Sequence, residues 1–354
     1  MKQFRLLLIF SLTVLFGTIQ AQDIHYSLFH MSPLTLNPAQ TGAFSGTVRI
    51  GGIYRDQWAS FLSNQFTTPS FYADAPIVRG FRPNDWVGVG FMVYSDQAGT
   101  GKLRTSASML SASYHLALNK DGTSILTLGL QGGNVSRRFD INSQNLLFED
   151  ESDIVGGGGP NTGMDRGGTG QEDLNASYLD FNGGVMFRSE LENDMKLELG
   201  FAAGHVTTPN YGLLSVGGGG GGNNNTPKEK KRPFRTTTHG RLNVPLTDLW
   251  SITPGFLWQS TAGANEIAIQ NWVGRKINED FTLNGGLAYR FSDAAQVLLG
   301  ADYKDLRVAL SYDVNVSSLT EVSNYQGGFE LAAYYIIKIY QKPAVKPAIL
   351  CPRF

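Results

Sequence analysis

Cysteine is nearly absent from this chain of 354 residues, which contains a single one, Cys351. One cysteine forms no internal disulfide, so the chain is not a scaffold held together by disulfide bonds. A strong net charge is absent as well, because 29 lysines and arginines nearly balance 30 aspartates and glutamates. Without a basic field, the composition predicts no nucleic-acid partner.

Long apolar runs are missing after the first 21 residues, so we expect no membrane-spanning helix, which needs about 20 apolar residues. At the start of the chain, two basic residues precede an apolar run from Leu6 to Phe16, and small and polar residues follow up to Ala21. This order is typical of a secretory signal peptide, and the apolar run is too short for a membrane anchor. We therefore predict that residues 1–21 are removed and that the chain is exported.

What the sequence has in abundance is alternation of apolar and polar residues, most clearly between Phe281 and Phe291. There, Leu283 and Leu287 share one face of an extended strand, and Thr282 and Asn284 share the opposite face. Alternating segments of about ten residues are typical of strands that cross a membrane obliquely in a barrel. The pattern recurs at 46–54, 66–76, 86–95, 103–118, 123–135, 177–189, 195–207, 233–245, 249–260, 264–276, 280–292, 295–303, 305–315 and 327–340. The sequence thus predicts an all-β fold, a transmembrane antiparallel β-barrel of about fourteen strands.

The connections between these strands differ in length in a regular way. Short polar turns are expected at 119–122, 192–194, 245–248, 278–280 and 304–305, and long links at 136–176, 208–232 and 316–326. Outer-membrane barrels have short periplasmic turns and long extracellular loops, so we place both termini in the periplasm.

The barrel itself is expected over residues 46–340. Residues 22–45 and 341–354 contain several prolines and carry no strand or helix pattern. We expect both segments on the periplasmic side or inside the lower mouth of the barrel.

The alternation also predicts which side chains line the interior. Polar residues that fall in phase on the inward face are expected to form the lumen wall, while their apolar neighbours meet outer-membrane lipid. The predicted lumen-lining residues are Ser111, Ser113, His115, Lys196, Glu198, Thr282, Asn284, Arg290, Arg307 and Asp313.

No motif predicts a cofactor or a metal. The glycine runs at 156–170 and 217–222 lack the Gly-Lys-Ser/Thr of a phosphate-binding loop. The acidic residues at 149–153 lack the spacing of a calcium loop, and no cluster of metal ligands accompanies His25 and His30. The basic run at 228–235 suits a solvated external loop near lipopolysaccharide phosphates.

No constellation predicts an enzyme either. His205 falls in phase with the apolar residues of 197–203, so we expect it to face outward near the external rim. His115 shares the lumen face with Ser111 and Ser113, which is more often a polar wall than a nucleophile and its base. We therefore expect no catalytic residue.

Three segments at the two ends of the chain resemble the PorP/SprF family. The first runs from His25 to Gly42 and contains Pro33, Asn37 and Pro38. The second and third resemble the end of the family's first strand and its C-terminal signature, and they consist of Tyr54, Arg55, Asp56, Gln57 and Trp58, and of Cys351, Pro352, Arg353 and Phe354.

This resemblance implies an outer-membrane β-barrel of the type IX secretion system of Bacteroidota. Its expected partners are envelope components of that system and the C-terminal domain of a secreted surface protein such as an adhesin, in secretion or gliding motility. We expect the signature residues to serve the architecture first and docking second. A passive channel for small molecules and a purely structural anchor are the alternatives, because polar lumen side chains also suit ions or sugars.

Overall fold

The computed structural model describes residues 23–58, 66–79, 82, 84–99, 102–139, 174–212, 230–317 and 320–339. Within them, fourteen β-strands follow one another along the chain, each overlapping a predicted strand. They are β1 (Val48–Gln57), β2 (Phe66–Arg79), β3 (Trp86–Ala98), β4 (Leu103–Ala117), β5 (Ser124–Phe139), β6 (Leu174–Glu190), β7 (Lys196–Gly204), β8 (Arg235–Pro245), β9 (Trp250–Thr261), β10 (Ala264–Lys276), β11 (Phe281–Arg290), β12 (Ala294–Tyr303), β13 (Leu306–Asn315) and β14 (Gln326–Ile337).

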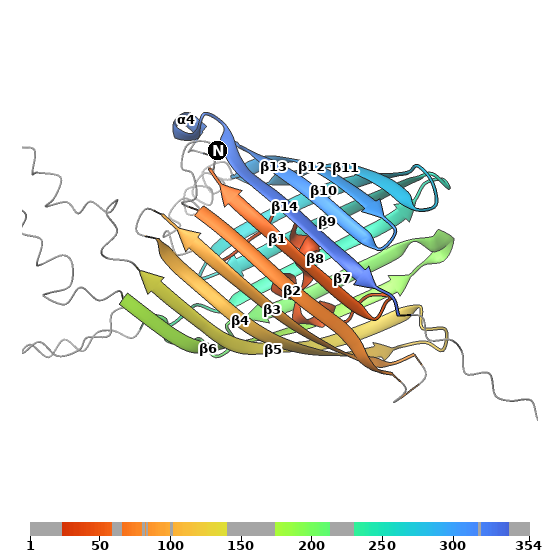
Figure 1. The fold of residues 1–354 in the computed structure, drawn as a ribbon, viewed down its shortest axis with the longest axis horizontal. Helices are drawn as coiled ribbons and strands as arrows, with labels where there is room; N and C mark the ends of the chain where they lie inside the picture. The colour runs from red at the N-terminus through yellow and green to blue at the C-terminus, as the bar shows by residue number, and fades with distance from the viewer. Residues whose placement is uncertain are drawn as a thin grey trace, which may run out of the picture.

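The strands form one closed antiparallel barrel in which each strand pairs with its neighbours in sequence (Figure 1). Closure comes from β1 and β14, which pair from Val48 opposite Ile337 to Gln57 opposite Gly328. A closed barrel leaves no strand edge without hydrogen-bond partners. The predicted fold class, an antiparallel barrel of fourteen strands, is therefore confirmed. No helix in the described ranges is long and apolar enough to span a membrane.

The two faces of the wall differ as the alternation predicts. Leu110 and Leu287 on the outer face are each 68% exposed, whereas Ser111 and Arg290 on the inner face are buried. Exposed leucines in such numbers are expected only where lipid replaces water around the barrel.

The two ends of the barrel carry connections of different length. The long links, between β5 and β6 and between β7 and β8, leave from the end on the left of Figure 1, which we call the external end. The opposite, periplasmic end carries short turns such as the one between β8 and β9. β1 begins and β14 ends at this periplasmic end. This arrangement is that of outer-membrane barrels.

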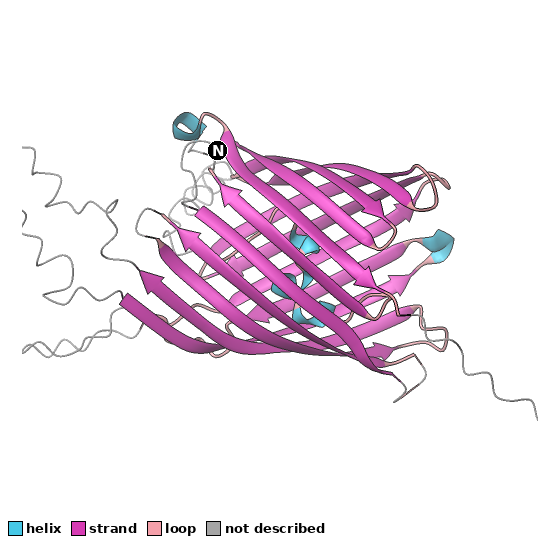
Figure 2. Ribbon diagram, in the orientation of Figure 1, coloured by secondary structure: helices cyan, strands magenta, loops and turns pink. Residues whose placement is uncertain are grey.

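Residues 23–45 form no strand, and instead make three short helical turns inside the barrel (Figure 2). These are η1 (Phe29–Met31), α2 (Pro33–Leu36) and η2 (Pro38–Gln40). The prediction of a segment without helix was wrong because Pro33 and Pro38 each occupy the first position of a helical turn. Proline suits that position, since the backbone N–H it lacks has no partner within the helix there. Two further single turns, η4 (Glu192–Asp194) and α4 (Thr320–Ser323), lie in connections.

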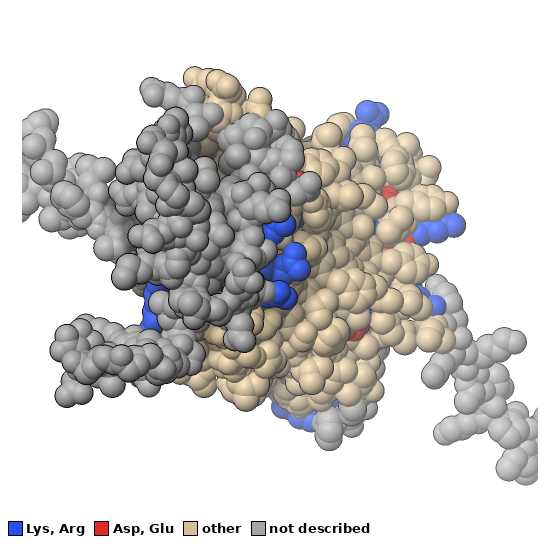
Figure 3. All heavy atoms as spheres, turned by 60° about the vertical axis from the view of Figure 1, so that its left-hand side comes forward, with Lys and Arg blue, Asp and Glu red and all other residues tan. Residues whose placement is uncertain are grey.

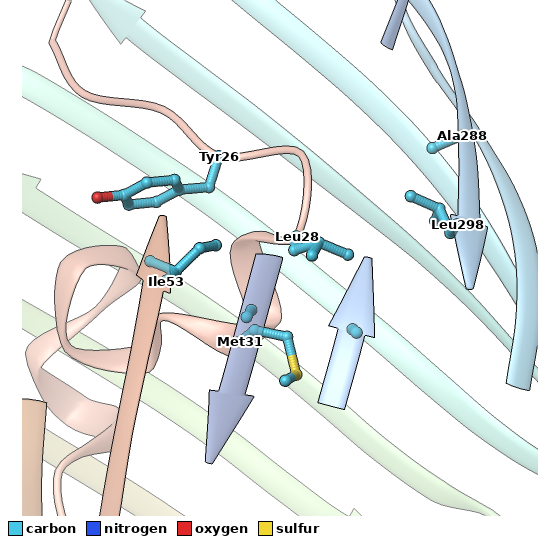
Figure 4. Packing of buried hydrophobic residues seen from close by; sticks show 8 residues of the cluster. Tyr26, Leu28, Met31, Ile53, Ala288 and Leu298 are labelled. Atoms are coloured by element: carbon cyan, nitrogen blue, oxygen red, sulfur yellow. The ribbon is translucent and has the colours of Figure 1, made fainter. Parts of the chain in front are cut away.

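The hydrophobic core of the molecule lies in the lumen, where these turns meet the wall. Figure 4 shows Leu28 and Met31 beside Leu298, with Tyr26 near Ile53. A second cluster brings Leu34 together with inward aromatic and methionine side chains, namely Tyr72, Met92, Tyr94, Met109 and Tyr178. The N-terminal segment therefore completes a core that the barrel wall does not form by itself.

Candidate functional site

Residues 23–45, which we call the plug, run through the lumen from one end to the other. Asp23 contacts His205, directly after β7, so it lies at the external end. Gly42 donates a hydrogen bond to Asp74 near the end of β2, so it lies at the periplasmic end. We expected this segment in the periplasm or in the lower mouth, but its described part spans the whole lumen, because its buried apolar and polar groups find their partners on the inner wall.

The periplasmic end of the plug is held by an ion pair. The Gly42 nitrogen donates to Asp74 Oδ2 at 2.7 Å, and Arg49 donates to both oxygens of the same carboxylate at 2.9 and 2.8 Å. The Trp86 indole in turn donates to the Gly42 carbonyl at 2.9 Å. Glycine is required at position 42, since φ is +66° and an added Cβ would lie 2.7 Å from the Gly88 backbone.

Ser113 and His115 also bind the plug, and Ser113 Oγ lies 2.8 Å from His115 Nε2. Arg188 has only donors and points at His115 Nδ1, so Nδ1 accepts and Nε2 carries the proton. Nε2 lies 2.8 Å from the Thr41 carbonyl oxygen, which accepts that proton, and Ser113 Oγ donates to the same oxygen at 2.6 Å. Both side chains therefore hold the plug in place.

Asn37 anchors the middle of the plug. This side chain is fully buried, and its Nδ2 donates to the carbonyl oxygens of Val185 and Phe201 at 3.1 and 3.3 Å. Its Oδ1 accepts the Ala39 N–H at 2.9 Å, which caps η2. A Cβ at Gly184 would collide with Asn37 Oδ1, so the wall has a glycine where the amide approaches the strand.

A cluster of four buried charges, which we call the charge cluster, holds the plug nearer its external end. Arg55 pairs with Glu330 and Asp313, and Arg290 pairs with Asp313 at 2.9 Å. Glu330 accepts two backbone N–H groups of the plug, from Ser27 at 2.7 Å and from the next residue at 2.8 Å. Two cations and two anions balance each other, and the plug completes the hydrogen bonds that buried charges need.

Asp23 is held by the contacts that we call the outer anchor. Its carboxylate lies 2.7 Å from His205 Nε2 and 3.5 Å from Arg235 Nη1, and it also pairs with Arg232. His205 Nδ1 lies 2.6 Å from Asp180. Burial alone would raise the pKa of Asp23, but the positive charges of Arg235, Arg232 and His205 outweigh it and hold that pKa well below its ordinary value.

Two predictions about this end of the barrel were wrong. His205 is buried and faces the lumen, because β7 ends at Gly204 and the positive φ of His205, 56°, breaks the strand alternation. Arg232 and Arg235 do not belong to a solvated loop, since the Asp23 carboxylate draws both side chains into the mouth of the lumen.

The predicted signature residues do not form one surface. Pro33, Asn37, Pro38 and Gly42 lie on the plug. Tyr54 is exposed on the outer face, and its hydroxyl lies 3.4 Å from the buried Asp56. Arg55 joins the charge cluster, and Gln57 ends β1, followed by Trp58 with a φ of 62°. Residues 1–22, the acidic and glycine-rich segments at 149–170 and 217–222, and the signature residues Cys351, Pro352, Arg353 and Phe354 lie outside the described part of the chain.

The predicted lumen residues divide into two groups. Ser111, Ser113, His115, Arg290 and Asp313 contact the plug or the charge cluster. The others line a cavity of about 300 Å³ toward the periplasmic end, between the plug and the wall, and these are Lys196, Glu198, Thr282, Asn284 and Arg307. Within it, Arg241 pairs with Glu198 at 2.6 Å, and Arg307 pairs with Asp302.

Sequence reasoning missed Glu330, the acceptor at the centre of the charge cluster, although a signal was present. It stands between Phe329 and Leu331, two outward apolar residues of β14, so the alternation applied elsewhere places this acid in the lumen. It also missed Asp23 and Ser27, which no pattern singled out, because partners such as His205 for Asp23 and Asp313 for Ser27 lie more than 180 residues away in sequence.

Comparison with known proteins gives one family. Residues 18–335 match the family model described as type IX secretion system membrane protein PorP/SprF. No curated protein matches the chain. Among solved structures, the CymD monoaromatic hydrocarbon channel is 10% identical with a TM-score of 0.49, and 88% of this chain and 94% of that one are covered. The Pseudomonas putida toluene transporter TodX is 9% identical with a TM-score of 0.47, and coverage is 88% and 93%.

Proposed function

Because this chain belongs to the PorP/SprF family of type IX secretion system membrane proteins, we propose that it is a closed adaptor rather than an enzyme or an open pore. As a closed antiparallel barrel of a membrane protein family, it lies in the outer membrane. In the proposed function it captures or anchors a secreted surface protein, such as an adhesin, through that protein's C-terminal domain.

The observation that carries this proposal is the plug. Leu34, Asn37 and Thr41 on it are at most 1% exposed, and hydrogen bonds tie them to β5, β7 and β4 of the lumen wall. A segment anchored at both ends and in the middle leaves the lumen filled, so transport through the barrel is not its resting activity. The barrel then acts through surfaces that it presents at its two ends, where the client and the envelope machinery would dock.

The first test is affinity purification of a tagged barrel from native membranes. Recovery of one large secreted protein in stoichiometric amount supports client capture, and loss of that protein when its C-terminal domain is removed identifies the contact. Recovery of envelope components without any secreted protein favours the purely structural anchor and contradicts capture.

A second test separates docking by the plug from its architectural role. Deletion of residues 24–42 is assayed for barrel insertion and for secretion of the client. Because the wall pairs strand to strand without the plug, we expect insertion to continue and secretion to fall. If neither changes, the plug has no part in docking.

A passive channel is the alternative, and the cavity of about 300 Å³ between plug and wall is the feature that favours it. Its lining of paired charges, amides and hydroxyl groups suits water, ions or small sugars. Conductance of the purified protein in planar bilayers discriminates the two. A large and steady conductance of the unaltered barrel would support the channel and contradict the closed adaptor.

A further inference from the structure

The outer anchor is built like a binding site for an anion, and a residue of the chain itself fills it. Three arginines, Arg137, Arg232 and Arg235, gather at the external mouth. The Asp23 carboxylate is the anion that two of them share, while Asp180 is turned to His205. Figure 3, which brings this end of the molecule forward, shows lysine and arginine side chains grouped there.

Arg137 and Arg232 are held in place by groups other than Asp23. Arg137 donates to the Tyr211 carbonyl at 2.9 Å and lies 4.7 Å from the centre of that ring. Arg232 donates to the Tyr178 hydroxyl at 2.5 Å. These contacts position the guanidinium groups whether or not Asp23 is bound, so the site is preorganised for a carboxylate.

The site also has unused capacity. Among the described residues, no group forms a hydrogen bond with the buried Arg235 Nε, and a cavity of about 60 Å³ lies beside Asp23, lined by Arg137, Tyr178 and Tyr211 among others. In this same part of the chain, Arg137 contacts a carbonyl and an aromatic ring, and neither supplies the negative charge that balances a guanidinium. A second carboxylate has both the space and the charge to enter.

We propose that the outer anchor is a carboxylate-binding site for an acidic peptide segment of the client, and that Asp23 occupies it until the client displaces it. This inference rests on the proposed function, since the site faces the compartment that a secreted client reaches. Displacement frees the outer end of the plug, while the charge cluster still holds Ser27. Client binding at the external end would in this way loosen the outer end of the plug in the lumen.

The test measures binding of a dye-labelled Gly-Ser peptide with aspartate side chains to the full barrel in detergent micelles, by fluorescence anisotropy. Asp23→Asn removes the internal competitor and keeps its shape, so we expect binding about tenfold tighter than to the unaltered barrel. Asp248→Asn, an exposed acid in the turn after β8, is the matched control and leaves binding unchanged. Adding Arg235→Gln to Asp23→Asn should remove the gain.

Further arms identify the ligand group. If a peptide with an amidated C-terminus binds as well as the free form, side-chain carboxylates are recognised, and if amidation abolishes binding, the terminal carboxylate is. A peptide with asparagine in place of aspartate and an amidated end should not bind. Equal affinity of Asp23→Asn and the unaltered barrel, or binding that ignores Arg235→Gln, would overturn the proposal.

Two readouts keep the result independent of folding and of the proposed function. In the unaltered barrel, the acidic peptide should speed hydrogen exchange at residues 23–26 and leave residues 37–42 unchanged; no change at 23–26 contradicts displacement. Client capture is measured separately. Capture that persists in Arg235→Gln refutes the site but keeps the adaptor, whereas peptide binding without any client refutes the adaptor but keeps the site.

Discussion

Gly129 offers the sharpest test of how the plug is seated. It lies on the inward face of β5, and a Cβ added there would lie 2.6 Å from Ala39 Cα and closer still to the Ala39 nitrogen. Ordinary Cβ contacts begin at 3.4 Å and the Ala39 nitrogen would lie at 2.3 Å, so Gly129→Ala forces the Ala39 backbone to move by about 1.1 Å, the difference between these two distances. Backbone atoms in a buried turn cannot rotate away, so the strain falls on the whole of η2.

Overpacking of this kind costs about 1–3 kcal/mol in a well-packed interior. The penalty applies only while the plug is seated, because the added methyl meets nothing once η2 withdraws. Since each 1.4 kcal/mol is a factor of ten, the population with a displaced plug should rise on the order of 10-fold to 100-fold.

Hydrogen exchange followed by mass spectrometry measures that population. Amides of Asn37, Gln40 and Thr41 are hydrogen-bonded within the plug, so their exchange reports its release. Gly183→Ala is the matched control, because Gly183 faces outward on the adjacent strand β6 and the nearest atom to its added Cβ is 3.8 Å away. We expect exchange at 37–42 to accelerate 10-fold to 100-fold over the control, with the strands unchanged in both.

Equal exchange in the two variants would refute the seating of η2 against β5. If Gly129→Ala fails to insert, Gly184→Ala replaces it, since its added Cβ meets the Asn37 side chain, which caps η2, rather than the plug backbone. Heat-dependent migration on a denaturing gel shows that each barrel is folded.

Other predictions test the remaining anchors. Glu330→Gln leaves Arg55 with a weaker partner and should cost about 2–3 kcal/mol of the free energy that holds the plug. Hydrogen exchange at residues 23–28 should therefore rise by about 30-fold to 100-fold. An unchanged exchange rate would contradict the role of the charge cluster. Asn37→Asp should lower the melting temperature more than Asn37→Ala, since a carboxylate would face two carbonyl oxygens; the reverse order would exclude the donor role of Nδ2. The lowered pKa of Asp23 adds stability that is complete above its ordinary value of 3.8 and is lost as pH falls through the lowered value. Proteolysis of the outer end of the plug should therefore not increase between pH 7 and about pH 4 and should rise only in stronger acid, and a rise at pH 5 would contradict this.

The alternation of side chains made the barrel predictable. A strand between lipid and a wet interior alternates apolar and polar residues. The local sequence is therefore enough to predict the fourteen strands and the direction in which side chains such as Leu287 and Arg290 point. The alternation failed where the local geometry changed. At His205, a residue with positive φ after the end of β7 turned the side chain inward, and no periodicity predicts such a break.

The sequence by itself determined the wall of this protein, because strand pairing follows chain order and each strand carries its own two faces. Only the tertiary structure decided what fills the lumen inside that wall. The plug is bound by partners such as Glu330 and His205, which lie far along the chain and meet it only when the barrel closes. Local patterns predict which residues face the lumen, but the meeting of a short N-terminal segment with both ends of that lumen depends on contacts between distant parts of the chain.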